Sequence, residues 1–254
     1  MRHPRRRVIV GGVDLTERFG MDLLDGFTLS PPAPKAYTVD IPGGDGVVDV
    51  TEALSGDVAY DDRQMSFTFL VRRPAGFEAT KTAVAGMLHG RRFPFVLSWD
   101  PGYTYTGRFT VSEWYAEMHH GQIKVDVDAE PYKLRESRTV RVAAAGGTEA
   151  VLECGRRRQC PTVECASECL VFVGGEGVRL QPGAWRLPEL WLAQGTNYVW
   201  VDSLPGVGDV PISEHAEEAV SLHASRHIAE LFWKERPADT EARAVYITYD
   251  VEEL

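Results

Sequence analysis

Strict alternation of polar and large apolar side chains is the feature that most restricts how this chain can fold. Residues 64–71 read Gln-Met-Ser-Phe-Thr-Phe-Leu-Val, and residues 122–129 alternate in the same way, with Ile123, Val125 and Val127 on one side. A period of two buries one face of a strand and exposes the other. By the same criteria further strands are predicted at residues 6–10, 36–41, 93–99, 104–114, 170–173, 198–201 and 244–249. The chain is therefore predicted to be mainly β.

Two segments depart from this period and are predicted to be helical. Residues 77–89 place apolar side chains at helical spacing, and Gly90 follows where a helix ends. Residues 213–234 begin with Ser213, a residue that caps helices, and Pro237 prevents continuation. We thus expect one helix in the first half of the chain and a C-terminal helical segment.

The composition changes between Tyr132 and Thr148, where charged residues give way to Ala-Ala-Ala-Gly-Gly at 143–147. Small residues of this kind are typical of a connection between domains. We predict an N-terminal domain over residues 1–135 and a C-terminal domain over residues 148–254, with an extension at about 213–254. That extension is acidic, with a net charge of −6.

Charge and hydropathy exclude several classes of function. The 27 Lys and Arg residues are outnumbered by 37 Asp and Glu residues, which gives a net charge of −10 and argues against a protein that coats nucleic acid. No run of 18 apolar residues is present, so no membrane span is predicted. The basic start leads to a very short apolar stretch rather than a signal peptide, so synthesis and folding are expected in the cytoplasm.

Four cysteines lie within 16 positions, at Cys154, Cys160, Cys165 and Cys169. Four thiolates can bind zinc in a tetrahedral array, but the usual paired spacing is only weakly present. The alternative is that these are small apolar residues buried in strands. We favour the second interpretation and expect no cofactor; metal analysis of the purified protein distinguishes the two.

No sequence pattern demands catalysis. His223 and His227 share a predicted helix face with Glu230, but Ala224 stands where a zinc protease requires glutamate. The chain has neither a nucleophile elbow nor a phosphate-binding loop. A pair of carboxylates for glycoside hydrolysis is a spatial arrangement that the sequence leaves open. We expect the protein not to be an enzyme.

Three tryptophans, Trp185, Trp191 and Trp200, lie within 16 residues. Tryptophan is highly buried on average, so at least two of them are expected in the core. Trp191 alternates with Leu190 and Leu192 and is expected to be the most exposed. An exposed Trp191 is the candidate for a carbohydrate contact.

Several motifs together resemble siphophage distal tail (Dit) proteins. The first is Ile-Pro-Gly-Gly-Asp-Gly at 41–46, followed by Asp-Val-Thr at 49–51 and by Tyr-Asp-Asp-Arg at 60–63 before the alternating strand. The second, Ala-Glu-Pro-Tyr-Lys at 129–133, resembles the close of the first Dit domain. The third, residues 180–201 with Gly-Thr-Asn at 195–197, resembles the galectin-like second domain. Residues 152–169 and 213–254 have no counterpart in this resemblance.

The resemblance implies a structural role in a phage tail tip. The expected fold is a tail-tube-like β-sandwich or barrel with one helix, then a galectin-like β-sandwich and the helical segment. It implies a homohexameric ring with a belt-like hairpin reaching the neighbour. Its implied partners are the tail tube protein, a tape-measure protein, a tail-associated lysin or hub protein and receptor-binding proteins, with DNA only as passing cargo.

Two further expectations follow. The alternative function is a carbohydrate-binding module for adhesion to the host, which a glycan array with Trp191→Ala tests. If the chain forms a ring around passing DNA, its net charge of −10 suggests an acidic bore along which phosphates slide without binding.

Overall fold

The structure is a computed structural model that describes residues 6–53, 56–71, 76–116, 120–143, 147–203 and 244–254. The chain divides into two compact units, Met1–Leu134 and Arg135–Glu253. Ring formation by the first and a galectin-like role for the second remain proposals.

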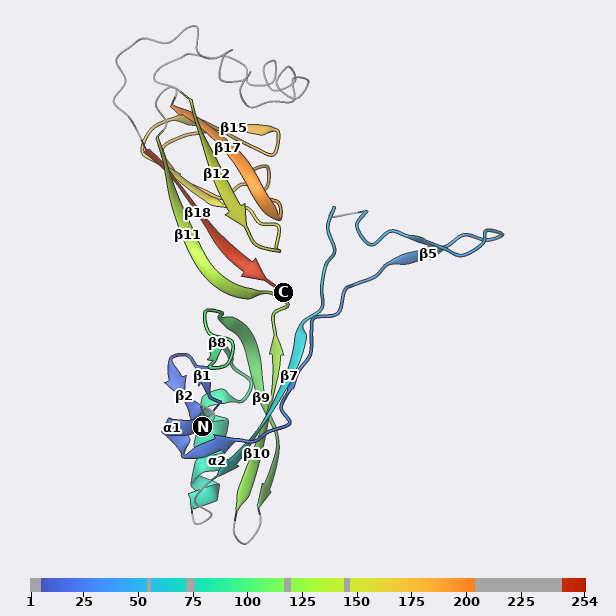
Figure 1. The fold of residues 1–254 in the computed structure, drawn as a ribbon, viewed down its shortest axis with the longest axis vertical. Coiled ribbons are helices and arrows are strands. Elements are labelled where there is room, and N and C mark those ends of the chain that lie inside the picture. Colours follow the sequence, from blue (N-terminus) through green and yellow to red (C-terminus); the bar gives the residue numbers. More distant parts are fainter. Residues whose placement is uncertain (1–5, 54–55, 72–75, 117–119, 144–146, 204–243) are drawn as a thin grey trace, which may run out of the picture. The chain divides into compact units, whose positions relative to one another are not determined.

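The first unit is built on one antiparallel sheet with two helices (Figure 1). Its strand order is β2-β1-β8-β9-β10-β7-β3, and β4 also pairs with β7. The helices are α1 (Leu15–Phe19) and α2 (Phe77–Leu88). The strands of this sheet are β1 (Val8–Val10), β2 (Val13–Asp14), β3 (Met21–Leu23), β4 (Thr28–Leu29), β7 (Arg63–Val71), β8 (Arg92–Leu97), β9 (Tyr105–Ala116) and β10 (Gly121–Ala129).

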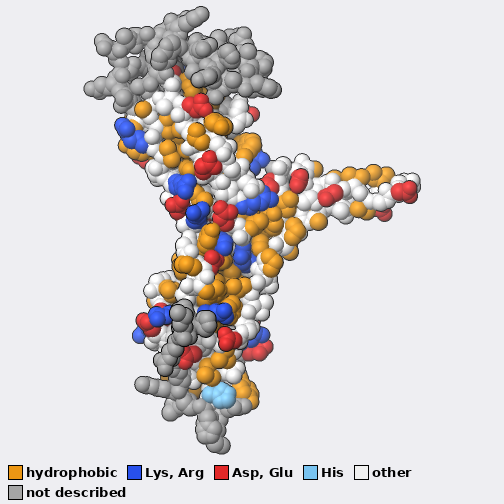
Figure 2. Space-filling model, viewed as in Figure 1, with side chains coloured by type: hydrophobic (Ala, Val, Ile, Leu, Met, Phe, Trp, Pro, Cys, Tyr) orange, Lys and Arg blue, Asp and Glu red, His pale blue; other side chains and the backbone are white. Residues whose placement is uncertain are grey.

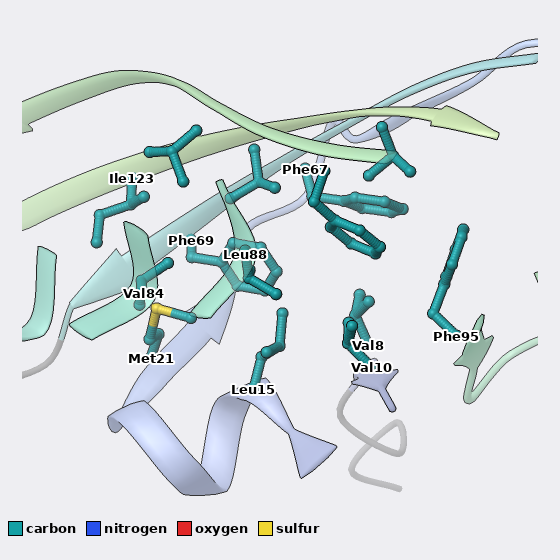
Figure 3. Packing of buried hydrophobic residues seen from close by; sticks show 14 of the residues in the cluster. Val8, Val10, Leu15, Met21, Phe67, Phe69, Val84, Leu88, Phe95 and Ile123 are labelled. Carbon is teal, nitrogen blue, oxygen red and sulfur yellow. The ribbon is translucent and has the colours of Figure 1, made fainter. Parts of the chain in front are cut away.

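The predicted alternation produces the core of this unit. Along β7 and β10 every second side chain is buried, and Phe67, Phe69 and Ile123 are fully enclosed. Figure 3 shows these side chains pointing from the sheet toward Leu15 of α1 and toward α2. The period-two prediction is confirmed for both strands, because one face of the sheet is closed by the helices.

The helix prediction for residues 77–89 is confirmed by α2, but the expectation of one helix is wrong for this unit. The short helix α1 was missed because its single turn carries too few residues to show a period. Its capping signal was nevertheless present: the Asp14 carboxylate accepts hydrogen bonds from the amides of Thr16 and Glu17, and Gly20 ends the helix in the left-handed conformation (φ 65°).

The interior of α2 offers a test of helix propensity. Gly86 is exposed, has ordinary helical geometry, and a methyl group added there meets no atom within 4 Å. The variant Gly86→Ala should therefore raise the free energy of unfolding by about 0.5–1 kcal/mol, because alanine loses less backbone entropy on folding. Urea denaturation measures the change; a decrease in stability would contradict the open environment of this position.

The second unit contains two four-stranded antiparallel sheets, β11-β18-β13-β16 and β12-β17-β14-β15. Their buried faces contribute one apolar cluster that includes Leu152, Val163 and Val171. Alternation of buried and exposed residues is clear in β18. The strands are β11 (Lys133–Ala143), β12 (Thr148–Cys154), β13 (Thr162–Cys165), β14 (Cys169–Val173), β15 (Glu176–Leu180), β16 (Gly183–Trp185), β17 (Gly195–Ser203) and β18 (Ala244–Glu253).

The second half of the chain differs from the sequence prediction at residues 133–143. The charged residues after Tyr132, predicted as part of a connection, form strand β11 instead, because they pair with β18 and expose their polar side. The predicted helical segment at 213–234 lies outside the described residues. Among the described residues no helix is long and apolar enough to span a membrane.

Candidate subunit interface

A hairpin arm, residues 35–61, leaves the first unit between β4 and β7. Its strands β5 (Thr38–Asp40) and β6 (Val47–Asp49) pair only with each other, in a separate two-stranded sheet. At its root the amide of Lys35 donates to the carbonyl of Ala59, and the amide of Asp61 donates to the carbonyl of Ala33, both at 2.8 Å. Figure 1 shows β5 on this hairpin, beyond the start of β7.

One face of the arm is apolar and exposed. Val39 lies directly opposite Val48, and Tyr37 and Ile41 share their side because alternate residues of an extended strand face the same way. These four side chains have exposed fractions between 45% and 61%. Figure 2 shows hydrophobic side chains along the arm. An amphipathic ribbon of this kind has nothing to bury its apolar face against within its own described chain.

The other face and the tip are acidic. Thr38, Asp40, Val47 and Asp49 occupy the opposite face, and the segment 36–62 has seven carboxylates and no Lys or Arg. Thr51 stabilises the hairpin: its hydroxyl donates to the Asp49 carboxylate at 2.5 Å, which lowers the pKa of Asp49. The arm is thus a preformed hairpin with an apolar side and an acidic side.

Glycines of the Ile-Pro-Gly-Gly-Asp-Gly motif at 41–46 close the hairpin. Gly43 and Gly46 have φ values of 83° and 76°, a region that side chains with a Cβ rarely enter. The Gly44 amide donates to the Ile41 carbonyl at 2.9 Å. The motif therefore forms the turn of the hairpin, and Gly43 and Gly46 are needed for its backbone geometry.

A polar cluster fixes the point where the arm joins the sheet. The Arg63 side chain, 8% exposed, donates to the Pro131 carbonyl at 2.7 Å and lies 5.5 Å from the centre of the Tyr105 ring. The Tyr105 hydroxyl donates to the Asp100 carboxylate, which also forms an ion pair with Lys133 at 3.0 Å. We call Arg63, Asp100, Tyr105 and Lys133 the root cluster.

The root cluster brings together two sequence motifs that lie far apart along the chain. The Tyr-Asp-Asp-Arg motif at 60–63 meets the Ala-Glu-Pro-Tyr-Lys motif at 129–133, because β7 and β10 are paired neighbours. The rings of Tyr60 and Tyr132 pack edge to face at 6.0 Å, beside the bond from Arg63 to Pro131. Both motifs therefore serve the base of the arm.

The root cluster predicts that stability falls at both ends of the pH scale. Burial raises the pKa of Asp100, but the hydrogen bonds from Tyr105 and Lys133 outweigh it and keep the pKa below 3.8. The ionised carboxylate therefore stabilises the fold above about pH 4, and this contribution is lost as the pH falls further and the carboxylate becomes protonated. Burial and the bond to Asp100 raise the pKa of Tyr105 above 10.0, so its contribution is full below pH 10 and is lost above it.

The measurement is the urea midpoint as a function of pH. Above pH 10, the Tyr105→Phe variant should not show the loss of stability that wild type shows when Tyr105 ionises. Below about pH 4, it should still lose part of the stability that depends on the Asp100 carboxylate. An alkaline profile identical in wild type and Tyr105→Phe would contradict the role of this hydroxyl.

The four cysteines are described and all are free thiols, three of them buried. Cys154 accepts a hydrogen bond from the Gln159 side chain at 3.3 Å, and burial raises the pKa of its thiol. Cys165 donates to the Gln181 carbonyl at 3.2 Å. Burial, with Cys165 nearby, raises the pKa of Cys169. Within the described ranges no group of three or more His, Cys, Asp or Glu residues could hold a metal ion.

The tryptophans of the second unit lie elsewhere than expected. Trp200 is buried, whereas Trp185, with 36% of its surface exposed, is more accessible than the half-buried Trp191. The Arg158 guanidinium lies 3.6 Å from the centre of the Trp191 ring, over one of its faces. The expectation that Trp191 is the most exposed is therefore wrong, because an arginine covers it; its sugar contact stays a prediction.

His223, His227 and Glu230 lie outside the described residues. The sequence did not single out the apolar face of the arm, although the alternation at 36–41 and the run of acids after it were available signals. It also missed two exposed aromatics at the end of β9, Trp114 and Tyr115, with exposed fractions of 52% and 56%.

Comparison with protein-family models and with curated proteins gives no match. Comparison with solved structures shows that the chain has the fold of a phage distal tail protein. A matching crystal structure is that of SPP1 Dit (gp 19.1), described as a paradigm of the hub adsorption apparatus in phages that infect Gram-positive bacteria. The match has a TM-score of 0.60 and 13% identity, and covers 97% of this chain and 99% of that one.

Proposed function

We propose that this protein is a structural component of a phage tail tip, where six copies form a ring that joins the tail tube to the host-adhesion apparatus. The role is architectural rather than catalytic. The likeness in fold to SPP1 Dit supports a place in an adsorption hub. The proposed partners are the tail tube, tape-measure, tail lysin and receptor-binding proteins, and the proposed location is the virion.

The observation that carries this proposal is the arm. Every residue from Ala36 to Asp49 is exposed, including the four apolar residues of one face. Leaving these side chains in water forgoes the gain of about 25 cal/mol for each Å² that burial would bring. The arm extends about 30 Å from Lys35 to Gly44, because nine extended residues each advance about 3.3 Å. That length suffices to reach across a neighbouring unit.

Charge favours a contact between unlike surfaces. An arm that paired with the same arm of a second copy would bring twelve carboxylates together with only two lysines, because residues 35–61 contain six Asp and Glu and the single base Lys35. The rest of residues 1–134 has fourteen Lys and Arg against twelve Asp and Glu, so its net charge is opposite to that of the arm. A contact between two different surfaces generates a closed ring or an open filament, not a two-fold dimer.

DNA passage is part of the proposal, but the open face of the large sheet gives no support to an acidic bore. On that face Asp128 lies opposite Arg108 and Glu113 lies opposite Lys124, while Asp126 lies opposite the uncharged Thr110 and Ser66. Two of these three acids face a base, so a wall of this composition would be polar, with an excess of one negative charge in the middle strands. Much of the net acidity lies instead in the arm and in residues 213–254.

Native mass spectrometry and negative-stain imaging of the full chain test the proposal. We expect a six-membered ring at micromolar concentration. A monomer that persists at high concentration, or an open filament without closed rings, would contradict it.

A further inference from the structure

The outer face of the sheet β11-β18-β13-β16 in the second unit has one exposed aromatic side chain among its described residues. Val245 and Ile247 of β18 are buried in the core, so Tyr246 between them points to the other side, where 42% of its surface is exposed. The other exposed large apolar residue of this sheet is Trp185, which lies opposite the buried Val163 and so belongs to the inner side. Tyr246 therefore stands alone among polar residues.

A basic and an acidic side chain flank this tyrosine. Glu164 of β13 is exposed and pairs directly with Tyr246. On the other side, the hydroxyls of Thr139 and Thr248 lie 2.9 Å apart across β11 and β18, two neighbouring strands in Figure 1. Two residues further along each antiparallel strand come Arg141, which is exposed, and Tyr246. The row across the sheet therefore reads Arg141, Tyr246, Glu164.

The two flanking charges have no partner among the described residues. Neither Arg141 nor Glu164 forms a hydrogen bond or an ion pair there through its side chain, and the Tyr246 hydroxyl forms none either. Neighbouring strands are about 4.8 Å apart, so the backbones that carry the two charges are about 10 Å apart, on either side of the ring. A ligand on the ring therefore meets donors at one edge and acceptors at the other, because a guanidinium only donates and a carboxylate only accepts.

This combination fits a saccharide better than a protein partner or an anion. A stable protein contact buries about 800 Å² on each side around an apolar centre, whereas this face offers a single ring. A sugar ring has an apolar face of C–H groups that packs on an aromatic ring, and hydroxyls that both donate and accept. An anion attracted by Arg141 would be repelled by Glu164. Threonine hydroxyls form the next row of the same face, at Thr139, Thr248 and Thr162.

We infer that the outer face of β18 binds an uncharged saccharide, which stacks on Tyr246 between Arg141 and Glu164. The guanidinium donates to sugar hydroxyls on one side, and the carboxylate accepts from sugar hydroxyls on the other. This site differs from the candidate contact at Trp191, whose ring Arg158 covers. It goes beyond the proposed architectural role and does not depend on ring formation.

Saturation-transfer NMR of the full chain with three uncharged oligosaccharides, of glucose, galactose and N-acetylglucosamine, tests the site. Wild type should bind at least one of them saturably, and Tyr246→Ala should weaken that binding by roughly 10-fold or more, the effect of losing a central contact residue. The matched control is Tyr198→Ala, at an exposed tyrosine of β17, which should bind like wild type. Binding of none of the three by wild type, or equal binding by Tyr246→Ala, overturns the inference.

The flanking charges give a second readout. Arg141→Met and Glu164→Gln should each lower the affinity, and the affinity of wild type should stay constant as salt rises from about 50 mM to about 500 mM, because the ligand is uncharged. Tighter binding by Glu164→Gln would mean an anionic ligand, and loss of binding in Trp191→Ala alone would place the sugar at Trp191; either result overturns the site. Circular dichroism checks folding. Tyr246→Ala should still form the rings expected of wild type, so failure of the site and failure of the proposed function are read separately.

Discussion

Replacing Val39 and Val48 together by lysine should convert the assembled protein into monomers. The two valines face each other across β5 and β6 with exposed fractions of 50% and 45%, so the hairpin itself can accept both lysines. At a subunit contact, however, two charges would replace apolar surface at every junction. We expect a loss of about 2–3 kcal/mol for each contact, or roughly 30- to 150-fold in affinity, from lost burial and desolvation of the lysines.

The matched control places the same two charges on the other face of the same hairpin. Thr38→Lys with Val47→Lys adds two lysines to the acidic side and should leave assembly intact. Mass photometry across a concentration series compares both variants with wild type. If the control variant dissociates as readily as Val39→Lys with Val48→Lys, net charge rather than the apolar face governs assembly.

The long strands were predictable because their burial is one-sided. In β7 and β10 the alternation in the sequence is the alternation of buried and exposed residues in the fold, so local pattern and tertiary environment agree. The helix α2 was predictable for the same reason. The helix α1 was not, since a helix of five residues is specified by its caps, Asp14 and Gly20, rather than by a period.

Candidate sites were harder to predict, because exposure depends on neighbours distant in the sequence. Alternation with Leu190 and Leu192 correctly buries both leucines, but no local pattern could indicate that Arg158 lies over the Trp191 ring. The arm shows the opposite case. Its residues 36–41 alternate like those of a core strand, and only the pairing of β5 and β6 with each other alone reveals that the apolar side remains exposed.

Removing the charge of Arg63 should produce the largest loss of stability of any single substitution considered in the first unit. The guanidinium is buried, donates to the Pro131 carbonyl at 2.7 Å and attracts the Asp100 carboxylate, so Arg63→Met leaves a buried acceptor unpaired and weakens the root cluster. We expect a decrease of about 2–4 kcal/mol in the free energy of unfolding. The control, Arg18→Met on the exposed side of α1, should change it by less than about 0.5 kcal/mol.

Urea unfolding of the whole chain measures the change, and hydrogen exchange of the amides in β7 and β10 assigns it to the first unit. Because Arg63 begins β7 two residues after the end of the arm, the same variant should lose exchange protection at the amides of Lys35 and Asp61, which form the root hydrogen bonds. A stability equal to wild type would show that the backbone ladder alone holds the root. Loss of protection in β7 and β10 with none at Lys35 and Asp61 would mean that Arg63 stabilises the sheet but does not position the arm.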